Sequence, residues 1–180
     1  MTDNALHLAI IIGSTRPGRF APTVANWFVA QARRRDDLTL DVIDLAEPGL
    51  DASAMSLRVA EADAFVVITP EYNHSFPAPL KNAIDWHSKE WHAKPIGFVS
   101  YGGVSGGLRA VEHLRQVFAE LHAVTVQRTV SFHSARAQFD QQGLPNDPDR
   151  YARSAESMLN QLVWWTRALR DARAARPYMA

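Results

Sequence analysis

The chain has 180 residues, 47% of them hydrophobic, and its 19 lysine and arginine residues balance its 19 aspartate and glutamate residues. This composition excludes a disordered or fibrous protein, and the length suits one core, so we expect residues 1–180 to form a single domain. The balanced charge argues against nucleic-acid binding through a basic face, and the absence of cysteine excludes disulfides, thiolate metal sites and cysteine nucleophiles.

The first half of the chain alternates apolar runs with amphipathic segments. The first element is Leu6 to Ile12, in which Ala9 to Ile12 is apolar without alternation and stops at Gly13; this predicts a strand buried on both faces of a parallel sheet. Apolar residues recur at helical spacing between Ala21 and Ala32 and predict a helix. A second strand is expected over Leu38–Leu45, and a shorter helix over Ser53–Glu61.

The second half repeats this alternation. Three further strands and three further helices are expected, in chain order, over 64–69, 77–86, 95–101, 111–121, 123–132 and 149–174. Polar Gln127 and Arg128 interrupt the last strand, so we expect it at a more exposed edge of the sheet. Five strands alternating with five helices predict an α/β fold, a doubly wound parallel sheet with helices on both faces.

The amino-terminal residues and the hydropathy also bear on location. Met1 to Asn4 include no basic leader, and no apolar run approaches the ~18–20 residues that span a membrane. We therefore expect a cytoplasmic protein without membrane contact.

Three loops should hold any ligand, because ligands of open α/β sheets bind beyond the carboxyl ends of the strands. The first loop, residues 13–22, combines the hydroxyls of Ser14 and Thr15 with the guanidinium groups of Arg16 and Arg19 at the start of a helix. Free N–H groups and fixed positive charge suit a terminal phosphate. The loop lacks the residues of the nucleoside-triphosphate and dinucleotide motifs, and an ordinary solvated turn remains the alternative.

The second and third loops suit a flat heterocycle. Residues 70–77 place short polar side chains between aromatic ones, which can bind the edge and the face of a ring. Residues 100–107 are rich in glycine, which permits close approach of the backbone. Either loop could equally do no more than turn the chain.

Two motifs in the sequence suggest other chemistry. Gly103 to Gly107 matches the G-x-S-x-G elbow of serine hydrolases, but no histidine follows His133, so the Ser, acid, His order fails for the downstream aspartates. His87 and His92 are five residues apart, which does not suit two ligands on one helix face. The nearby Trp86 and Trp91 look like packing or interface residues.

The three loops taken together resemble the NAD(P)H-dependent FMN reductase family, the flavodoxin-like quinone, azo and chromate reductases. The resemblance runs to about residue 170 and is carried by residues 13–19, 70–75 with 79–86, and 100–103 with 105–107. It implies a sheet order of 2-1-3-4-5 with FMN at the point between strands one and three where the order reverses.

The resemblance also implies the cofactor-binding residues. The phosphate would be held by Ser14, Arg16 and Arg19 with the N–H groups of Phe20, Ala21, Pro22 and Thr23. The isoalloxazine and ribityl groups would lie along Pro70, Glu71, Tyr72 and Asn73. The other side would be closed by Ser100, Tyr101, Gly102, Gly103, Ser105 and Gly106.

The implied activity is transfer of a hydride from NADPH or NADH to FMN, followed by two-electron reduction of a quinone, flavin, azo compound or similar small acceptor. The flavin carries the chemistry, so no catalytic side chain and no metal is expected. Family members are usually dimers or tetramers, so the resemblance implies a homodimer or homotetramer, with the helix at 77–87 and the tryptophans as candidate contact surfaces. Arg109 could meet the 2′-phosphate of NADPH or stay solvated. The alternative is a flavodoxin-like electron carrier or redox sensor, although carriers tend to be acidic.

Overall fold

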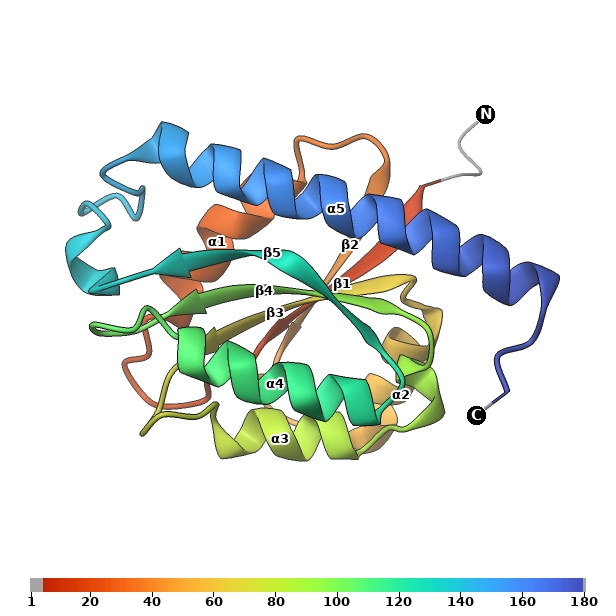
Figure 1. The fold of residues 1–180 in the computed structure, drawn as a ribbon. Helices are drawn as coiled ribbons and strands as arrows, with labels where there is room; N and C mark the ends of the chain where they lie inside the picture. The colour runs from red at the N-terminus through yellow and green to blue at the C-terminus, as the bar shows by residue number, and fades with distance from the viewer. Residues whose placement is uncertain (1–4, 180) are drawn as a thin grey trace.

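The computed structural model describes residues 5–179, so Met1–Asn4, considered above for a leader, lie outside it. Five strands form one parallel sheet in the order β2-β1-β3-β4-β5, which confirms the predicted order (Figure 1). The strands are β1 (Leu6–Ile12), β2 (Leu38–Asp44), β3 (Ala64–Pro70), β4 (Pro95–Tyr101) and β5 (Val124–Phe132). The helices are α1 (Ala21–Ala32), α2 (Ala52–Glu61), α3 (Ala78–Asp85), α4 (Leu108–Glu120) and α5 (Pro148–Ala175).

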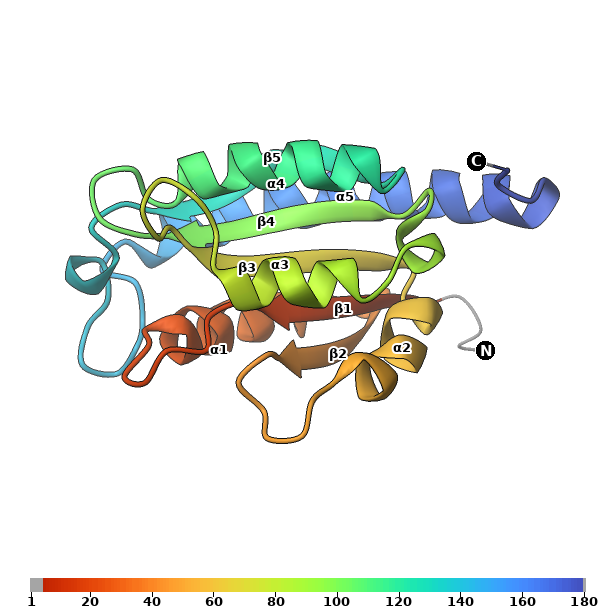
Figure 2. The ribbon, with the colours of Figure 1, turned by 90° about the horizontal axis from the view of Figure 1, so that it is seen from below.

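Helices cover both faces of the sheet. Figures 1 and 2 show α1 and α5 on one face and α2, α3 and α4 on the other. Successive residues of a strand point to opposite faces, so β1 buries Leu8, Ile10 and Ile12 against the first layer and Ala9 and Ile11 against the second. The strands β1, β3 and β4 therefore have no solvent face: all their residues are buried except His7, which is half-buried.

The predicted edge position of the last strand is confirmed. β5 pairs only with β4 in the sheet, and its register shifts between the partners of Ile96 and Phe98. Gln127 and Arg128 lie at this irregularity and are exposed. An edge strand has one unpaired side, so it tolerates polar residues that a central strand would bury.

Two short 3-10 helices, η1 (Lys89–Trp91) and η2 (Ala135–Ala137), are not apparent in the sequence pattern. Trp91 lies in η1 and is fully buried, with its ring centroid 4.6 Å from that of Phe65 and 5.5 Å from that of Phe118. Of the two roles considered for Trp91, the structure supports packing. Trp27 is buried as well, so neither ring is a contact surface.

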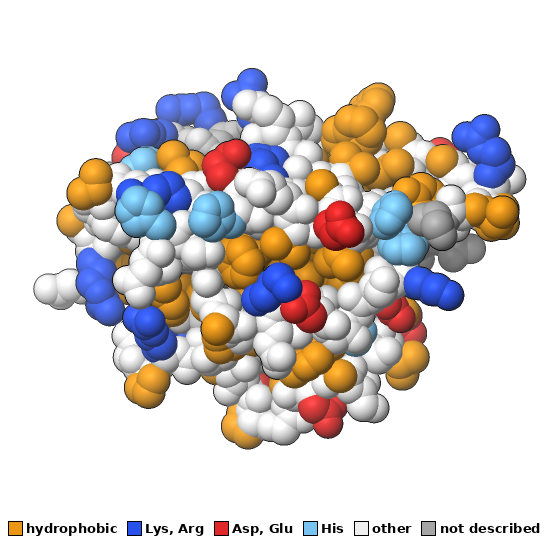
Figure 3. All heavy atoms as spheres, turned by 60° about the horizontal axis from the view of Figure 1, so that its bottom comes forward, with side chains coloured by type: hydrophobic (Ala, Val, Ile, Leu, Met, Phe, Trp, Pro, Cys, Tyr) orange, Lys and Arg blue, Asp and Glu red, His pale blue; other side chains and the backbone are white. Residues whose placement is uncertain are grey.

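The outer face over α3 and α4 carries mixed charge. Figure 3 shows acidic and basic side chains interspersed there, with hydrophobic side chains reaching the surface between them. Lys81 and Asp85 of α3 form one of the ion pairs, at 2.6 Å. None of the helices within residues 5–179 combines the length and the apolar character that crossing a bilayer requires.

Candidate functional site

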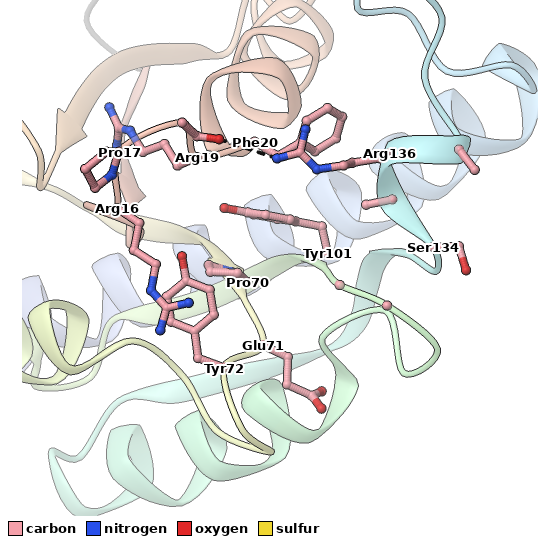
Figure 4. Close-up of a pocket in the computed structure, with 15 residues that line it drawn as sticks. Arg16, Pro17, Arg19, Phe20, Pro70, Glu71, Tyr72, Tyr101, Ser134 and Arg136 are labelled. Carbon is pink, nitrogen blue, oxygen red and sulfur yellow. Dashed lines mark hydrogen bonds between the residues drawn. The ribbon is translucent and has the colours of Figure 1, made fainter.

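A cavity of about 630 Å³ opens at the carboxyl ends of the strands (Figure 4). This volume falls in the ~300–1,000 Å³ range of small-molecule sites. All three predicted loops contribute to its lining, and so does η2. The lining residues are Arg16, Pro17, Gly18, Arg19, Phe20, Pro70, Glu71, Tyr72, Tyr101, Gly102, Gly103, Ser134, Ala135, Arg136 and Ala137.

The start of α1 faces this end of the sheet with unbound backbone donors. Phe20 is the N-cap residue, and its side chain makes no capping hydrogen bond. Within the described residues, the N–H groups of Ala21 and Thr23 make no hydrogen bond, whereas Pro22 has no N–H and cannot assist a phosphate as expected. Uncapped N–H groups at a helix N-terminus attract an anion.

Arg16 and Arg19 lie three residues apart but have different surroundings. Arg19 donates to both carboxylate oxygens of Asp44 at 2.6 Å and to the carbonyl oxygen of Ser14 at 2.5 Å. The parallel pairing of β1 with β2 sets Ile12 opposite Asp44, which brings that carboxylate to the first loop. Donating these hydrogen bonds to Asp44 raises the pKa of Arg19, so the charge of Arg19 is paired within the protein.

Arg16 is exposed, and its guanidinium carbon lies 3.6 Å from the centroid of the Tyr72 ring. The Tyr72 hydroxyl is 2.7 Å from Oγ of Ser14, a side chain without solvent exposure. No ion pair to Arg16 occurs within residues 5–179. Arg16 is therefore held against the second loop with its charge uncompensated.

Tyr101 lies at the end of β4 and is 5% exposed. Figure 4 shows its ring extending between the loops that carry Phe20 and Tyr72. Its hydroxyl is buried and has no hydrogen-bond partner in the part of the chain that the structure describes. Burial raises the pKa of this hydroxyl, which stays protonated and can donate. A buried donor without a partner costs about 1–3 kcal/mol, which a ligand atom could recover.

Glu71, in the second loop, also lines the cavity, and hydrogen bonds hold its carboxylate in place. Its carboxylate accepts hydrogen bonds from Oγ of Ser105 at 2.6 Å and from Nε of Arg109 at 2.6 Å. Burial would raise the pKa of Glu71, but these hydrogen bonds outweigh burial and lower it. Arg109 also lies 2.9 Å from Nε2 of His74 and does not line the cavity, so its charge is committed to the loops.

The third loop approaches the end of β4 closely, and this requires glycine. Gly107 has a φ of +86°, and an added Cβ would lie 2.7 Å from Cβ of Ser100 and 2.9 Å from the backbone nitrogen of Tyr101. Oγ of Ser100 donates to the carbonyl oxygen of Gly106 at 2.8 Å. These contacts fix the chain that carries Gly102 and Gly103 along the cavity.

About half of the expected site residues line the cavity, and the rest lie behind or beside it. Those that line it are Arg16, Arg19, Phe20, Pro70, Glu71, Tyr72, Tyr101, Gly102 and Gly103. Those outside the lining are Ser14, Ala21, Pro22, Thr23, Asn73, Ser100, Ser105 and Gly106. Ser14, Ser100 and Ser105 hold lining residues or their loops through the hydrogen bonds above.

Sequence reasoning missed η2, which forms the wall beyond β5. The N–H groups of Ser134 and Ala135 donate to the carbonyl oxygens of Gly103 and Gly102, at 2.7 and 2.9 Å. Arg136 extends from η2 toward the first loop (Figure 4), with its guanidinium carbon 5.3 Å from the centroid of the Phe20 ring. The only signal in the sequence is a basic residue shortly after a strand, which is too common to use.

The two competing motifs have structural explanations. Oγ of Ser105 donates to Glu71, while Nδ1 of His133 is 2.7 Å from the carbonyl oxygen of Val104. His87 is buried beside Trp91. Over residues 5–179, no three His, Asp or Glu side chains gather as a metal site would require.

A family model described as NADPH-dependent FMN reductase matches residues 6–137. The chain belongs to this family. The matched range includes the first loop, the second loop, the glycine-rich loop and η2, which are all the segments that line the cavity.

Curated relatives and solved structures agree with this placement. The chain is 34% identical over 140 residues to the quinone reductase of Escherichia coli K12, covering 68% of this chain and 74% of that one. It is 37% identical over 119 residues to an NAD(P)H-dependent FMN reductase of Schizosaccharomyces pombe, covering 56% of this chain and 60% of that one. The chain spans between 39% and 60% of the length of that reductase and four plant quinone oxidoreductases.

Among solved structures, the flavoenzyme NAD(P)H:acceptor oxidoreductase FerB of Paracoccus denitrificans has a TM-score of 0.72 at 20% identity, covering 91% of this chain and 98% of that one. General stress protein 14 of Treponema denticola, solved in complex with FMN, has a TM-score of 0.59 at 18% identity, covering 91% of this chain and 99% of that one. At these identities the likeness establishes the flavodoxin-like fold alone.

Proposed function

We propose that this protein is an FMN-dependent NAD(P)H oxidoreductase that passes two electrons to a quinone, flavin, azo compound or similar small acceptor. The observation that carries the proposal is that the match to the family spans every segment lining the cavity. The relatives named as quinone reductases support a quinone as acceptor.

The residues present suit FMN. A phosphate would find uncapped N–H groups at Ala21 and Thr23 and an uncompensated guanidinium at Arg16. A planar polar ring would find the buried hydroxyl of Tyr101, which lacks a partner within the described chain. The backbone N–H of Gly103 also makes no hydrogen bond to another described residue, and Gly103 lines the cavity.

The expected site residues then divide by role. We assign Arg16 and the first turn of α1 to the phosphate. Arg19 serves as a positioning residue, because its guanidinium is bound to Asp44 and to the carbonyl of Ser14. The remaining assignments follow the family: Pro70, Glu71, Tyr72 and Asn73 on one side of the ribityl chain and ring, and Ser100, Tyr101, Gly102, Gly103, Ser105 and Gly106 on the other.

Bound FMN would supply the transfer of a hydride from NAD(P)H and of two electrons onward to the acceptor. The protein would orient the ring and stabilise the negative charge that reduction creates. N–H groups fixed in advance stabilise such charge without reorganisation. The N–H groups of Glu71 and Gly102 already bind the carbonyls of Tyr101 and Phe132, so Gly103 is the better donor. No side chain needs to act as a base.

We further propose that residues 1–180 form one domain, that the protein works in the cytoplasm, and that it forms a homodimer or homotetramer. The face over α3 and α4 supports self-association, because hydrophobic side chains surface there between charged ones (Figure 3). Electron acceptors are expected to be small molecules, given the cavity of about 630 Å³.

The test is the visible spectrum of purified protein before and after addition of FMN and desalting, followed by NADPH and NADH oxidation with a quinone. Retained flavin absorption and nicotinamide oxidation would support the proposal. Retained flavin without nicotinamide oxidation would favour the electron carrier or sensor. Protein that releases all added FMN and does not oxidise NAD(P)H with free FMN supplied would refute both.

A further inference from the structure

Arg136 is a second uncompensated charge on the cavity. Of the four arginines at or beside the site, Arg19 is paired with Asp44 and Arg109 with Glu71. Arg16 and Arg136 have no carboxylate partner among residues 5–179. The chain has no net charge, so two unpaired guanidinium groups on one cavity make it locally attractive to anions.

The backbone of Arg136 is anchored by hydrogen bonds, whereas its guanidinium makes only a weak contact. Two backbone hydrogen bonds join η2 to Gly102 and Gly103, so the Cα of Arg136 moves with the cavity wall. Its guanidinium lies over the Phe20 ring and contacts the carbonyl oxygen of Gly18 at 3.4 Å. This distance is long for a hydrogen bond, so exchanging the contact for an anion costs little. Arg136 is also exposed, so it can meet a ligand that arrives from solvent.

The two arginines have different neighbours. Arg16 belongs to the first loop, and its guanidinium lies over the Tyr72 ring of the second loop. Arg136 belongs to η2, and its exposed guanidinium lies on another side of the cavity, over the ring of Phe20, the N-cap residue of α1. A nicotinamide nucleotide carries phosphate groups, whereas a neutral quinone carries none. An exposed cation on the cavity therefore favours the donor over the acceptor.

We propose that Arg136 binds the phosphate groups of the incoming nicotinamide nucleotide and so determines donor affinity, an inference that rests on the proposed function. It replaces Arg109 as the candidate for this role, because the Arg109 side chain is bound to Glu71 and His74. Arg136 is a specificity-determining residue here and takes no part in the transfer itself.

The test compares Arg136→Ala and Arg136→Lys with the wild type. The matched control is Arg150→Ala, because Arg150 is also exposed and lies over an aromatic ring, 5.5 Å from the centroid of Tyr151, but does not line this cavity. Four quantities are measured: the KM for NADPH, the KM for the phosphate-free donor dihydronicotinamide riboside, the Kd for NADP+ by calorimetry, and the Kd for FMN by fluorescence quenching.

We expect Arg136→Ala to raise the KM for NADPH and the Kd for NADP+ roughly 5- to 10-fold, the effect of one exposed charge-assisted contact. The KM for the riboside and the Kd for FMN should stay within about 2-fold, Arg136→Lys should lose less, and Arg150→Ala should match the wild type. Three results would overturn the inference: equal losses with both donors, weakened FMN binding, or no change. A wild-type protein that fails to bind FMN or oxidise NADPH would instead refute the proposed function.

Discussion

Replacing Arg16 and Arg19 separately with alanine should affect different properties, although the resemblance implies that both residues hold the phosphate. We expect Arg16→Ala to weaken FMN binding without destabilising the protein. We expect Arg19→Ala to destabilise the FMN-free protein. The reason is that the Arg16 guanidinium lies over the Tyr72 ring without an ion pair to any described residue, whereas the Arg19 side chain makes three hydrogen bonds to Asp44 and Ser14.

The contacts set the magnitudes. A hydrogen bond to a charged group contributes about 1.5–3 kcal/mol, so Arg16→Ala should raise the Kd for FMN roughly 10- to 150-fold. Loss of its exposed ring contact should cost the FMN-free protein no more than about 1 kcal/mol. The side chains of Arg19 and Asp44 are only 16% and 30% exposed. Removing Arg19 leaves that carboxylate without its partner, so we expect a loss of about 2–3 kcal/mol in unfolding free energy.

Fluorescence titration of apoprotein with FMN gives the Kd, and urea unfolding of the same apoprotein gives the free energy of unfolding. Asp44→Ala and the Arg19→Ala/Asp44→Ala double variant complete a cycle, in which the pair should show a coupling of about 1–2 kcal/mol. The reasoning is refuted if Arg19→Ala leaves unfolding unchanged and weakens FMN binding more than Arg16→Ala does. It is equally refuted if Arg16→Ala leaves FMN binding unchanged.

Three further predictions concern the third loop, the cavity and the outer edge of the sheet. Gly107→Ala should lower the free energy of unfolding in urea by about 2–4 kcal/mol, because Gly107 has a positive φ and is crowded against β4. Gly103→Ala should lower it by less than about 1 kcal/mol, because a Cβ there meets nothing within 4 Å, and equal losses would contradict this reasoning. Tyr101→Phe removes a buried hydroxyl that has no hydrogen-bond partner among the described residues. The variant should leave the stability of the apoprotein unchanged or raise it by up to about 1 kcal/mol, and it should weaken FMN binding. A marked loss of apoprotein stability would show that the hydroxyl already has a partner. The hydrogen bonds from Arg58 lower the pKa of Asp41 in the folded state. The stability that Asp41 contributes is therefore fully present above the ordinary carboxyl pKa of about 4 and is lost as the pH falls through the lowered value. Asp41→Asn should flatten the acid side of the stability curve measured by urea unfolding from about pH 2 to 7, and an unchanged slope would argue against this role.

The fold was predictable because its signals are local. Residues 9–12 of β1 and 64–68 of β3 are apolar without alternation, which is typical of strands covered on both faces. Strand boundaries moved by one or two residues, as in β2, which ends at Asp44 rather than Leu45. The positions of the three loops follow from the same alternation, so the end of the sheet that holds the cavity was also predictable.

Which charged side chains at the cavity are paired, and which are not, was not predictable. Arg16 and Arg19 share one short loop, and nothing local distinguishes the exposed guanidinium from the paired one. Asp44 is 25 residues from Arg19, and it reaches the first loop only because β1 and β2 pair in parallel. Arg136 is 118 residues from Gly18, which it contacts through η2.

The amino-acid sequence alone therefore determined the order of elements, the buried strands and the loops that line the cavity, since hydrophobic periodicity and helix starts depend on neighbouring residues. The tertiary structure alone decided which charges are neutralised and which remain available. Charge pairing depends on distance in space, and strand register and loop closure set that distance between residues that are remote along the chain.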